Sequence, residues 1–417
     1  MRVLQVNFGD VIGSRFNNFG IRHLLAEEGI AVTHLVWKQL SNDPEVAPIF
    51  AYPGSRFLNR KLDALERELS IHSVLQLHSF ALPMQRAFRR ADLVHYHLIH
   101  DGYFSILALP FLSRLKPSVW TWHDPWTMSG HCIYPLECQR WRIGCGECPQ
   151  LDLPFAVKRD RTAFNFRQKK WVYDHMDIDV VVASKYMLDR AKSSPLATNI
   201  RLHHIPFGID LAHFRPRPSE PARKRLGVFE GRIVIGVRAF DSPFKGYEFF
   251  LDALAQLPTN LQLCIITTHG KGDLNRYIGR HQIIELGWVD DEQVLLDYFM
   301  ASDLFVMPST AEAFGLMAVE AMACSKPVIV FDGTALPEVS FAPEVGVAVP
   351  LRDAKALAAV IARLALDPNE RRVRGERGLA AAERHYDARQ CAERLATLYR
   401  SVAARRQFGD TTMEAAL

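Results

Sequence analysis

The sequence predicts an α/β protein with two parallel-sheet domains that face each other across a cleft. Three observations support this fold class: a length of 417 residues, short apolar runs spaced widely enough for intervening helices, and a proline-rich interruption between two series of such runs. A chain of this length usually exceeds one hydrophobic core. Alternating strands and helices form parallel sheets, which bind ligands at the carboxyl ends of their strands.

The predicted strands follow in two series. Apolar or β-branched runs begin at residues 2, 31, 93, 118 and 179, and again at 232, 261, 283, 303, 327 and 345. Pro206 and the prolines that follow it up to position 221 indicate a linker. We therefore expect a first domain at 1–205, a linker at 206–220 and a second domain at 221–384. Apolar residues three and four apart in 385–408 predict a helix, which we expect to cross back to the first domain.

Composition excludes several classes of protein. Fifty Lys and Arg against 46 Asp and Glu leave a formal charge of +4, too little to indicate a nucleic-acid partner. No apolar stretch reaches the roughly 18 residues of a membrane span, and the N-terminus has no signal-peptide pattern. We expect a cytoplasmic protein and leave open its attachment to the inner face of the plasma membrane.

The second domain carries a candidate binding site for a nucleotide diphosphate in PSTAEAFGLMAVEAMA, where a loop and a helix follow a predicted strand. A helix that begins near Gly315 directs free N–H groups and the positive end of its dipole toward a diphosphate. Glu320, about one and a half turns into this helix, is placed to accept hydrogen bonds from a ribose. Glu312, before the helix, faces the group on the far phosphate.

Two cations stand in the first loop of this domain. Arg238 and Lys245 lie in VRAFDSPFKG, ahead of a tight entry into a helix at Gly246. Beside a helix N-terminus, the two cations neutralise a diphosphate and stabilise it as a leaving group. The alternative is that both are solvated loop charges.

These motifs resemble glycosyltransferase family 4. The similarity covers nearly the whole chain and rests on FKG at 244–246, the segment 286–309, the two Glu residues spaced eight apart, and KPVIV. The resemblance implies a GT-B fold of two Rossmann-like domains, retaining transfer from a nucleotide sugar, and no cofactor for catalysis. The stretch from TWHDPW to CPQL further resembles a branch found in gene clusters for colanic acid and other bacterial surface polysaccharides.

The resemblance also assigns roles to residues. Arg238 and Lys245 match the diphosphate clamp, Glu320 the ribose ligand, and Glu312 the contact to the donor sugar. The backbone segment at the phosphates is matched by Phe314, Gly315 and Leu316.

The sequence departs from the family pattern in three ways. Ser325 stands where the family usually has Gly, and Phe207 replaces the usual Asn before GID. Arg238 and Lys245 are two residues further apart than is common.

In the first domain, His123 and Asp124 follow the predicted strand SVWTWH and so stand at its carboxyl end. A lone His is more often a satisfied structural residue, but this place favours a function. In the family, a His at the matching position contacts the donor sugar. We expect His123 to position the sugar and Asp124 to orient the imidazole ring. With Glu312, these two residues complete the predicted catalytic set.

Two further groups are candidates near the acceptor. The loop after the first strand offers Gly13, Ser14 and Arg15 for acceptor or phosphate binding, with a helix that opens near Asn17; the alternative is an ordinary turn. His95 and His97 alternate along one strand and so share a face. Packing or a role near the acceptor is favoured over metal binding, which needs a third ligand.

Four of the seven cysteines fall in one segment, with five, six and two residues between them. In a reducing cytoplasm this spacing favours a structural zinc ion that staples the loop 131–150 beside His123. The alternative is unmetallated thiols or disulfide bridges. The predicted ligands are Cys132, Cys138, Cys145 and Cys148.

Residues 56–90 combine apolar residues at helical spacing with basic residues. Two interpretations stay open. The segment lies on an anionic membrane surface, as suits a lipid-linked acceptor, or it forms a pair of helices that cover the sheet.

The sequence thus predicts transfer of a hexose from a UDP- or GDP-sugar to a hydroxyl of a growing surface polysaccharide, on a glycan or lipid-linked glycan acceptor. The alternatives are a GT-B epimerase and a non-catalytic, zinc-stapled subunit of a polysaccharide assembly complex. A phosphorylase is disfavoured because no cofactor lysine motif is identifiable. A non-catalytic subunit is expected to have degraded donor residues, whereas Glu312, Glu320 and Lys245 are all present.

Overall fold

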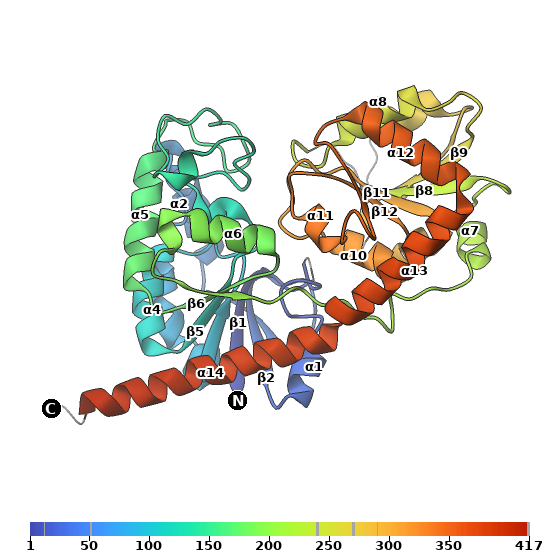
Figure 1. Ribbon diagram of the computed structural model, residues 1–417. Helices are drawn as coiled ribbons and strands as arrows, with labels where there is room; N and C mark the ends of the chain where they lie inside the picture. Colours follow the sequence, from blue (N-terminus) through green and yellow to red (C-terminus); the bar gives the residue numbers. More distant parts are fainter. Residues whose placement is uncertain (12, 51, 239–241, 269–271, 290, 415–417) are drawn as a thin grey trace. The chain divides into compact units, whose positions relative to one another are not determined.

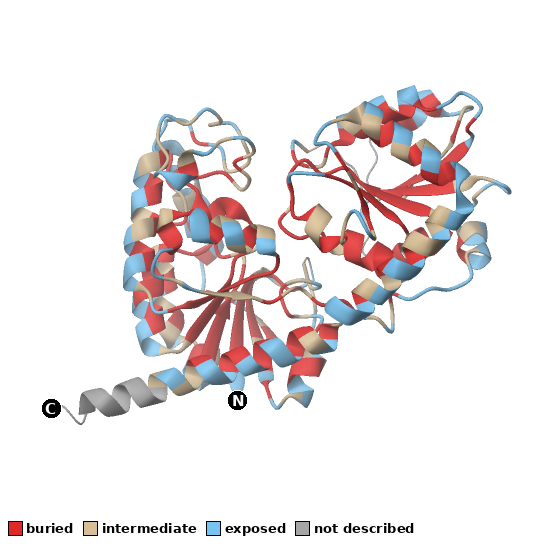
Figure 2. Ribbon diagram, viewed as in Figure 1, coloured by how far each residue is buried: buried red, intermediate tan, exposed pale blue. Residues whose placement is uncertain are grey.

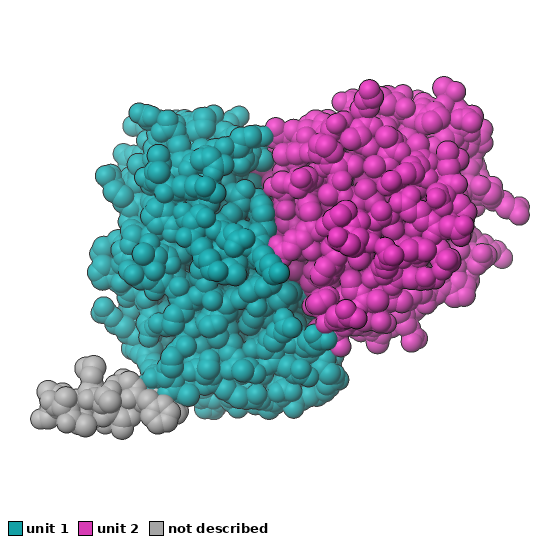
Figure 3. Space-filling view, in the orientation of Figure 1, with its two compact units in different colours: residues 1–208, 389–417 teal, residues 209–388 magenta. Residues whose placement is uncertain are grey.

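The computed structural model describes residues 1–11, 13–50, 52–238, 242–268, 272–289 and 291–414 (Figure 1). The chain divides into two compact units (Figure 3): unit 1 comprises residues 1–208 and 389–417, and unit 2 comprises residues 209–388. Each unit contains one parallel sheet with its own helices. The predicted α/β fold class with two sheet domains is confirmed.

Unit 1 is built on seven parallel strands in the order β3-β2-β1-β4-β5-β6-β7. They are β1 (Arg2–Gly9), β2 (Ala31–Lys38), β3 (Val46–Pro48), β4 (Leu93–Tyr96), β5 (Ser118–Thr121), β6 (Asp179–Val182) and β7 (Arg201–His204). All five predicted runs form strands, and every residue of β4, β5 and β6 is buried (Figure 2). The edge strands β3 and β7 were not predicted, because β3 has only three residues and β7 reads RLHH, without an apolar face.

The segments between these strands, and the C-terminal segment, form the helices of unit 1. The α-helices are α1 (Arg22–Glu27), α2 (Ser55–Leu69), α3 (Arg86–Arg90), α4 (Leu109–Leu115), α5 (Thr162–His175), α6 (Lys185–Ser193) and α14 (Ala388–Glu414). Short 3-10 helices are η1 (Leu77–Met84), η2 (Ile106–Ala108), η3 (Pro125–Met128), η4 (Arg140–Arg142) and η5 (Pro195–Ala197).

Unit 2 is built on six parallel strands in the order β10-β9-β8-β11-β12-β13, all of them predicted. They are β8 (Ile233–Val237), β9 (Leu263–Thr267), β10 (Gln282–Glu285), β11 (Leu304–Met307), β12 (Val328–Phe331) and β13 (Val347–Val349). The helices are α7 (Glu220–Leu226), α8 (Tyr247–Gln256), η6 (Asp273–Tyr277), α9 (Glu292–Ala301), α10 (Leu316–Ala323), α11 (Leu336–Val339), α12 (Ala354–Leu366) and α13 (Pro368–His385). Phe250 and Leu254 of α8 share one buried core cluster with Leu357 and Ile361 of α12.

The strand order places a topological switch point in each sheet. In unit 1, β1 lies between β2 and β4, and in unit 2, β8 lies between β9 and β11. The loops after β1 and β4, and those after β8 and β11, therefore diverge from neighbouring strand ends and leave room for a ligand at the carboxyl edge. This edge is where the predicted site residues should be sought.

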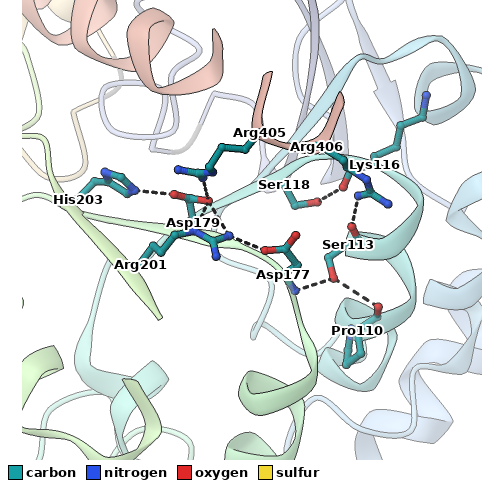
Figure 4. A network of polar contacts seen from close by, with 10 residues as sticks. All are labelled: Pro110, Ser113, Lys116, Ser118, Asp177, Asp179, Arg201, His203, Arg405 and Arg406. Atoms are coloured by element: carbon teal, nitrogen blue, oxygen red, sulfur yellow. Dashed lines mark hydrogen bonds and ion pairs between the residues drawn. The ribbon is translucent and has the colours of Figure 1, made fainter. Parts of the chain in front are cut away.

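The long helix α14 belongs to unit 1, which confirms that the chain returns to its first domain (Figure 1). The buried carboxylate of Asp179, at the start of β6, pairs with Arg405 of α14 and with Arg201 and His203 of β7 (Figure 4). Burial raises the pKa of Asp179, but these three cationic or donor partners hold it lower, at about 2. Among the described residues, no helix combines the length and apolar character needed to cross a membrane.

Candidate active site

The loops after β8 and β11 interlock in unit 2. The Thr310 N–H donates to the Phe244 carbonyl at 2.9 Å. Gly246 has a φ of +60°, and a Cβ at this position would lie 1.9 Å from the carbonyl oxygen of Pro308. Only glycine permits this approach, and the neighbouring Lys245 is thereby held against the loop after β11.

Lys245 and Glu312 form an ion pair in these loops. Lys245 Nζ lies 2.7 Å from Glu312 Oε2, and the side chains are only 15% and 13% exposed. Burial lowers the pKa of Lys245, against the attraction of Glu312. Burial alone would raise the pKa of Glu312, but the charges of Lys245 and Arg238 hold it below its ordinary value. The structure thus brings these three predicted residues together.

Arg238 follows β8 directly and points toward α10. Its N–H donates to the Val306 carbonyl at 3.0 Å, and its Nε lies 3.0 Å from Met317 Sδ in the first turn of α10. Its charge acts on both Lys245 and Glu312. The longer sequence spacing between Arg238 and Lys245 therefore does not separate the two cations in space.

The head of α10 is shaped by Gly315. This residue caps the helix with a φ of +96°, and a Cβ there would lie 2.3 Å from Leu336 Cδ2. The Phe314 ring packs edge-on against Tyr386, with 5.7 Å between centroids, and Leu316 begins the helix. The first N–H groups of an α-helix have no acceptor within it, and an anion suits a helix end that two cations flank.

Glu320 occupies the middle of α10, as predicted, but its side chain is fully buried. A ribose would contact it only after neighbouring side chains shift. Glu320, the residue predicted to bind the ribose, thus lies on the predicted helix, but its side chain is beneath the surface.

In unit 1, a chain of hydrogen bonds holds His123. Its Nε2 lies 3.0 Å from His97 Nδ1, and His97 Nε2 lies 2.7 Å from Gln5 Oε1. The Gln5 oxygen can only accept, so His97 donates from Nε2 and accepts at Nδ1 from His123. Burial lowers the pKa of His123 to about 3 and that of His97 well below its usual value, so both rings are neutral. This arrangement leaves His123 Nδ1 as a hydrogen-bond acceptor.

Two aromatic rings enclose His123. Phe207 stacks on the imidazole with 5.5 Å between centroids and 14° between planes, and the Phe16 centroid lies 5.2 Å away. Gly13, with a φ of +83°, makes room for Phe16, because a Cβ there would lie 2.5 Å from Phe16 Cζ. Neither ring was predicted as part of the site. The only signal in the sequence was the departure from the family pattern at Phe207.

Contrary to the prediction, Asp124 does not orient the imidazole ring of His123. Its Oδ2 lies 3.2 Å from His100 Nε2, and its Oδ1 accepts from the Trp126 N–H at 2.9 Å. Burial alone would raise the pKa of Asp124 and lower that of His100, but their mutual attraction shifts each pKa the other way, toward an ion pair. Asp124 therefore orders the turn after β5, and His97 orients His123.

The loop after β1 contains no helix near Asn17, contrary to the prediction, and α1 begins only at Arg22. Asn17 Nδ2 donates to the Gly9 carbonyl at 3.0 Å, and Asn18 adopts a φ of +67°, which an α-helix does not contain. The loop instead folds as turns, with the Phe16 N–H donating to the Gly13 carbonyl at 2.9 Å. The three predicted loop residues in these turns are Gly13, Ser14 and Arg15.

His95 of β4 and His97, the first residue after β4, lie side by side with ring centroids 4.2 Å apart. His95 Nδ1 lies 2.7 Å from the Tyr399 hydroxyl of α14, and its Nε2 lies 2.8 Å from Thr121 Oγ1. Asn18 Nδ2 lies 3.3 Å from the same hydroxyl. These residues form a neutral hydrogen-bonded network beneath His123, in line with the packing interpretation of the two histidines.

The four cysteines of the loop 131–150 are free thiols that line one small cavity together with His131. The cavity measures about 10 Å³, roughly the space that one water needs. The Gly130 N–H donates to Cys145 Sγ at 3.2 Å, and His131 Nε2 lies 3.4 Å from Cys148 Sγ. Within the described residues, however, no three His, Cys, Asp or Glu side chains already have the geometry of a metal site.

Comparison with known proteins identifies the family. A family model described as Glycosyltransferase Family 4 matches residues 24–213, and one described as Glycosyl transferases group 1 matches residues 231–367. D-inositol 3-phosphate glycosyltransferase of Saccharomonospora viridis is 31% identical over 341 residues, which cover 78% of this chain and 74% of that protein. WcaC of Escherichia coli, named for colanic acid biosynthesis, is 24% identical over 258 residues, covering 59% of this chain and 61% of WcaC.

Solved structures agree on the fold. Sucrose-phosphate synthase from Thermosynechococcus elongatus superposes with a TM-score of 0.69 at 21% identity, covering 97% of this chain and all of that chain. HepE from Anabaena superposes with a TM-score of 0.63 at 17% identity, covering 96% of this chain and all of HepE. By sequence this protein belongs to glycosyltransferase family 4, and it has the GT-B fold.

Proposed function

We propose that this glycosyltransferase transfers a hexose from a UDP- or GDP-sugar to a hydroxyl of a growing surface polysaccharide, with retention of the anomeric configuration. The observation that carries the proposal is the ion pair of Lys245 and Glu312 at the switch point of unit 2, beside Arg238 and the head of α10. Cations at a helix N-terminus suit a diphosphate that becomes a leaving group.

In the proposed step, the bond between sugar C1 and the diphosphate oxygen breaks, and its electron pair leaves with the diphosphate. The acceptor hydroxyl oxygen forms the new bond to C1 on the same face, and its proton passes to the departing diphosphate oxygen. Lys245, Arg238 and the N–H groups of α10 stabilise the negative charge that develops. Glu312 contacts the sugar, and Glu320 contacts the ribose.

His123 is proposed to position the transferred sugar. Since its Nε2 donates to His97, its Nδ1 is available to accept from a sugar hydroxyl. The ring is neutral, because burial lowers the pKa of His123 to about 3, so it orients the sugar without serving as an acid.

Names of similar proteins support the donor and acceptor classes. HepE was crystallised with UDP and with UDP-glucose, and a relative in Corynebacterium glutamicum, 28% identical over 245 residues, is named a GDP-mannose-dependent mannosyltransferase. Both bases therefore stay in the proposal. WcaC is named for colanic acid and the structural neighbour WaaG for lipopolysaccharide biosynthesis, which supports a surface glycan, lipid-linked, as the acceptor.

A thermal-shift screen of UDP, GDP, ADP and their sugars tests the donor site. We expect one nucleoside diphosphate to raise Tm and Glu320→Ala to abolish that shift, whereas Glu376→Ala, exposed on α13, keeps it. NMR of the transfer product should then show the donor's anomeric configuration. An inverted product, or an epimerised donor without any acceptor product, would refute the proposal, and so would a screen without any stabilising nucleotide.

We also propose that the loop 131–150 holds a structural zinc ion on Cys132, Cys138, Cys145 and Cys148. The four thiols surround one cavity, and four thiolates suit tetrahedral zinc. Burial raises the pKa of Cys132 and of Cys145, against the weaker attraction of the buried Lys169 ammonium, so zinc binding must displace a proton from each thiol. Because the thiols do not yet have metal geometry, binding requires them to draw together.

Metal analysis of protein purified under reducing conditions tests this zinc proposal. We expect close to one zinc per chain, lost in Cys145→Ser and retained in Cys391→Ser, a buried cysteine of α14. Four reactive thiols without stoichiometric metal in the unmodified protein would refute the site.

A further inference from the structure

Large apolar side chains of two neighbouring elements in unit 1, η1 and α4, face solvent. Phe80 and Met84 of η1 are 39% and 77% exposed, and Phe111 and Leu115 of α4 are 42% and 45% exposed. Leu77, at the start of η1, is 60% exposed. Core-facing helices bury such side chains, so this outward orientation requires an explanation.

Direct contacts join the elements that carry these side chains. The rings of Phe80 and Phe111 lie 6.0 Å apart and so join η1 to α4. Phe111 and Leu115 stand one turn apart on α4. Lys116 Nζ donates to the Arg89 carbonyl at 3.4 Å, which joins the end of α4 to α3. We call the exposed surface of η1, α3 and α4 the docking face.

The docking face is basic as well as apolar. Residues 77–90 and 106–116 contain five cations and no Asp or Glu. Within the described part of the chain, no ion pair joins any of the five to a carboxylate. The five are Arg86, Arg89, Arg90, Arg114 and Lys116. The end of α14 adds another cation beside α4, because Arg406 donates to the Ser113 carbonyl (Figure 4).

The helix α2 provides a contrast within the same unit. It also turns apolar residues outward, among them Phe57 at 59% exposure, and its buried positions are Ser55, Asn59 and Glu66. The interpretation of residues 56–90 as helices that cover the sheet with an apolar face is therefore wrong for α2. Its exposed charges, however, include carboxylates paired with Arg67 and Lys158, so α2 lacks the single-sign charge of the docking face.

We infer that the docking face binds the surface of an anionic membrane. Apolar side chains can enter the boundary between headgroups and acyl chains, while flanking Lys and Arg attract anionic lipids. An acidic protein partner would match the charge, but the protruding Met84, Leu77 and Phe80 suit a fluid apolar layer without fixed pockets. The inference rests on the proposed function in one respect: a lipid-linked acceptor would give the enzyme a reason to bind the membrane.

Co-sedimentation with vesicles tests the docking face directly. The full chain is mixed with vesicles of phosphatidylcholine alone, or with about one third phosphatidylglycerol, at low and moderate salt. We expect binding to the anionic vesicles alone, weakened by salt. Arg89→Glu with Arg90→Glu should lower the partition coefficient by more than about tenfold, since each cation near the surface contributes roughly a factor of five. Met84→Ser with Phe111→Ser should lower it at both salt concentrations.

Matched controls separate this inference from the proposed function. Lys192→Glu with Lys355→Glu changes as many exposed charges elsewhere, and Leu366→Ser removes an exposed apolar side chain of α12; all should bind vesicles like the unmodified protein. Thermal shift with the stabilising nucleotide shows whether the variants keep the donor site. If the unmodified protein ignores anionic vesicles, or the Arg89 and Arg90 variant binds them fully, the docking face is refuted even though nucleotide binding persists.

Discussion

The carboxyl edges of the two sheets have the same topology and opposite chemistry. At the switch point of unit 2 stand the charged groups Lys245 and Glu312, with Arg238 beside them. At the switch point of unit 1, His123 and His97 are uncharged because burial lowers the pKa of each ring, and the ion pair of Asp124 with His100 orders the turn beside them. One edge offers charge and a helix N-terminus, whereas the other offers hydrogen bonds and aromatic faces.

This difference indicates which part of a nucleotide sugar each edge is suited to bind. A diphosphate carries charge and gains more during bond cleavage, so it needs cations and N–H groups that are already oriented. A sugar carries hydroxyls and is neutral, so it needs donors, acceptors and apolar ring surfaces. Two sheets with the same central strand order therefore differ in chemistry through a few loop residues.

Removing the Lys245 ammonium should have the largest effect. In Lys245→Ala we expect kcat/KM for transfer to fall by about 10² to 10³, because a group that stabilises the leaving charge is lost and Glu312 stays buried without its partner. Lys355→Ala, exposed on α12, is the matched control. Steady-state kinetics measures the effect, and unchanged kinetics in Lys245→Ala would show that the charged edge does not bind the diphosphate.

Acid should destabilise unit 1 more than unit 2. Burial lowers the pKa of His34 to about 4, that of His123 to about 3, and those of His95 and His97 well below the usual value. Below about pH 6.5 these histidines are protonated in the unfolded chain but stay neutral in the folded one. The free energy of unfolding therefore decreases as the pH is lowered from about 6.5 to the pKa values of the folded state. Each histidine contributes up to about 1.4 kcal/mol per pH unit.

Hydrogen exchange of both units at pH 6.5 and pH 5.0 measures this effect. We expect unit 1 to lose at least about 3 kcal/mol of protection relative to unit 2. Two groups reduce the difference: Asp124 raises the pKa of His100 against the effect of burial, and in unit 2 burial lowers the pKa of His281 to about 4. Equal losses of protection in the two units would mean that the histidines of unit 1 are hydrated or charged in solution. That result would contradict the difference in charge between the carboxyl edges of the two sheets.

His97 should act on turnover through His123. In His97→Ala the imidazole of His123 loses its hydrogen-bond partner, and we expect kcat to fall about tenfold, while the affinity for the bare nucleotide stays unchanged. His97→Gln, whose side-chain oxygen can accept from His123 Nε2, should restore part of the rate. A parallel loss of nucleotide affinity would indicate a general structural defect instead of lost orientation.

The sequence predicted the central strands because strands buried on both faces appear as continuous apolar runs. The edge strand β7 escaped prediction because it is polar and partly exposed. The residues of the charged edge were predictable since Glu312, Gly315 and Glu320 lie in one loop–helix segment that resembles the family pattern.

The neutral edge was only partly predictable. The strand-end position singled out His123, but its surroundings come from distant parts of the chain. Phe16 and Phe207 contact it from two loops, and Tyr399 reaches the network from α14, 304 residues after His95. No local spacing in the sequence indicates such contacts. The prediction that Asp124 orients His123 was wrong because the Asp124 carboxylate pairs with His100, which is close to it in space.

The smallest expected effect concerns Ser325, where the sequence departs from the family's usual Gly. Ser325 has a φ of +59° at the end of α10, a left-handed conformation that costs an L-residue with a Cβ roughly 1 kcal/mol. Ser325→Gly should therefore raise the stability of unit 2 by about 0.5–1 kcal/mol without changing unit 1, as denaturant unfolding and hydrogen exchange can measure. Ser193→Gly, at the end of α6 in unit 1, is a control that should not stabilise. If Ser325→Gly also altered nucleotide affinity, the position of α10, and with it the charged edge, would depend on this strained residue.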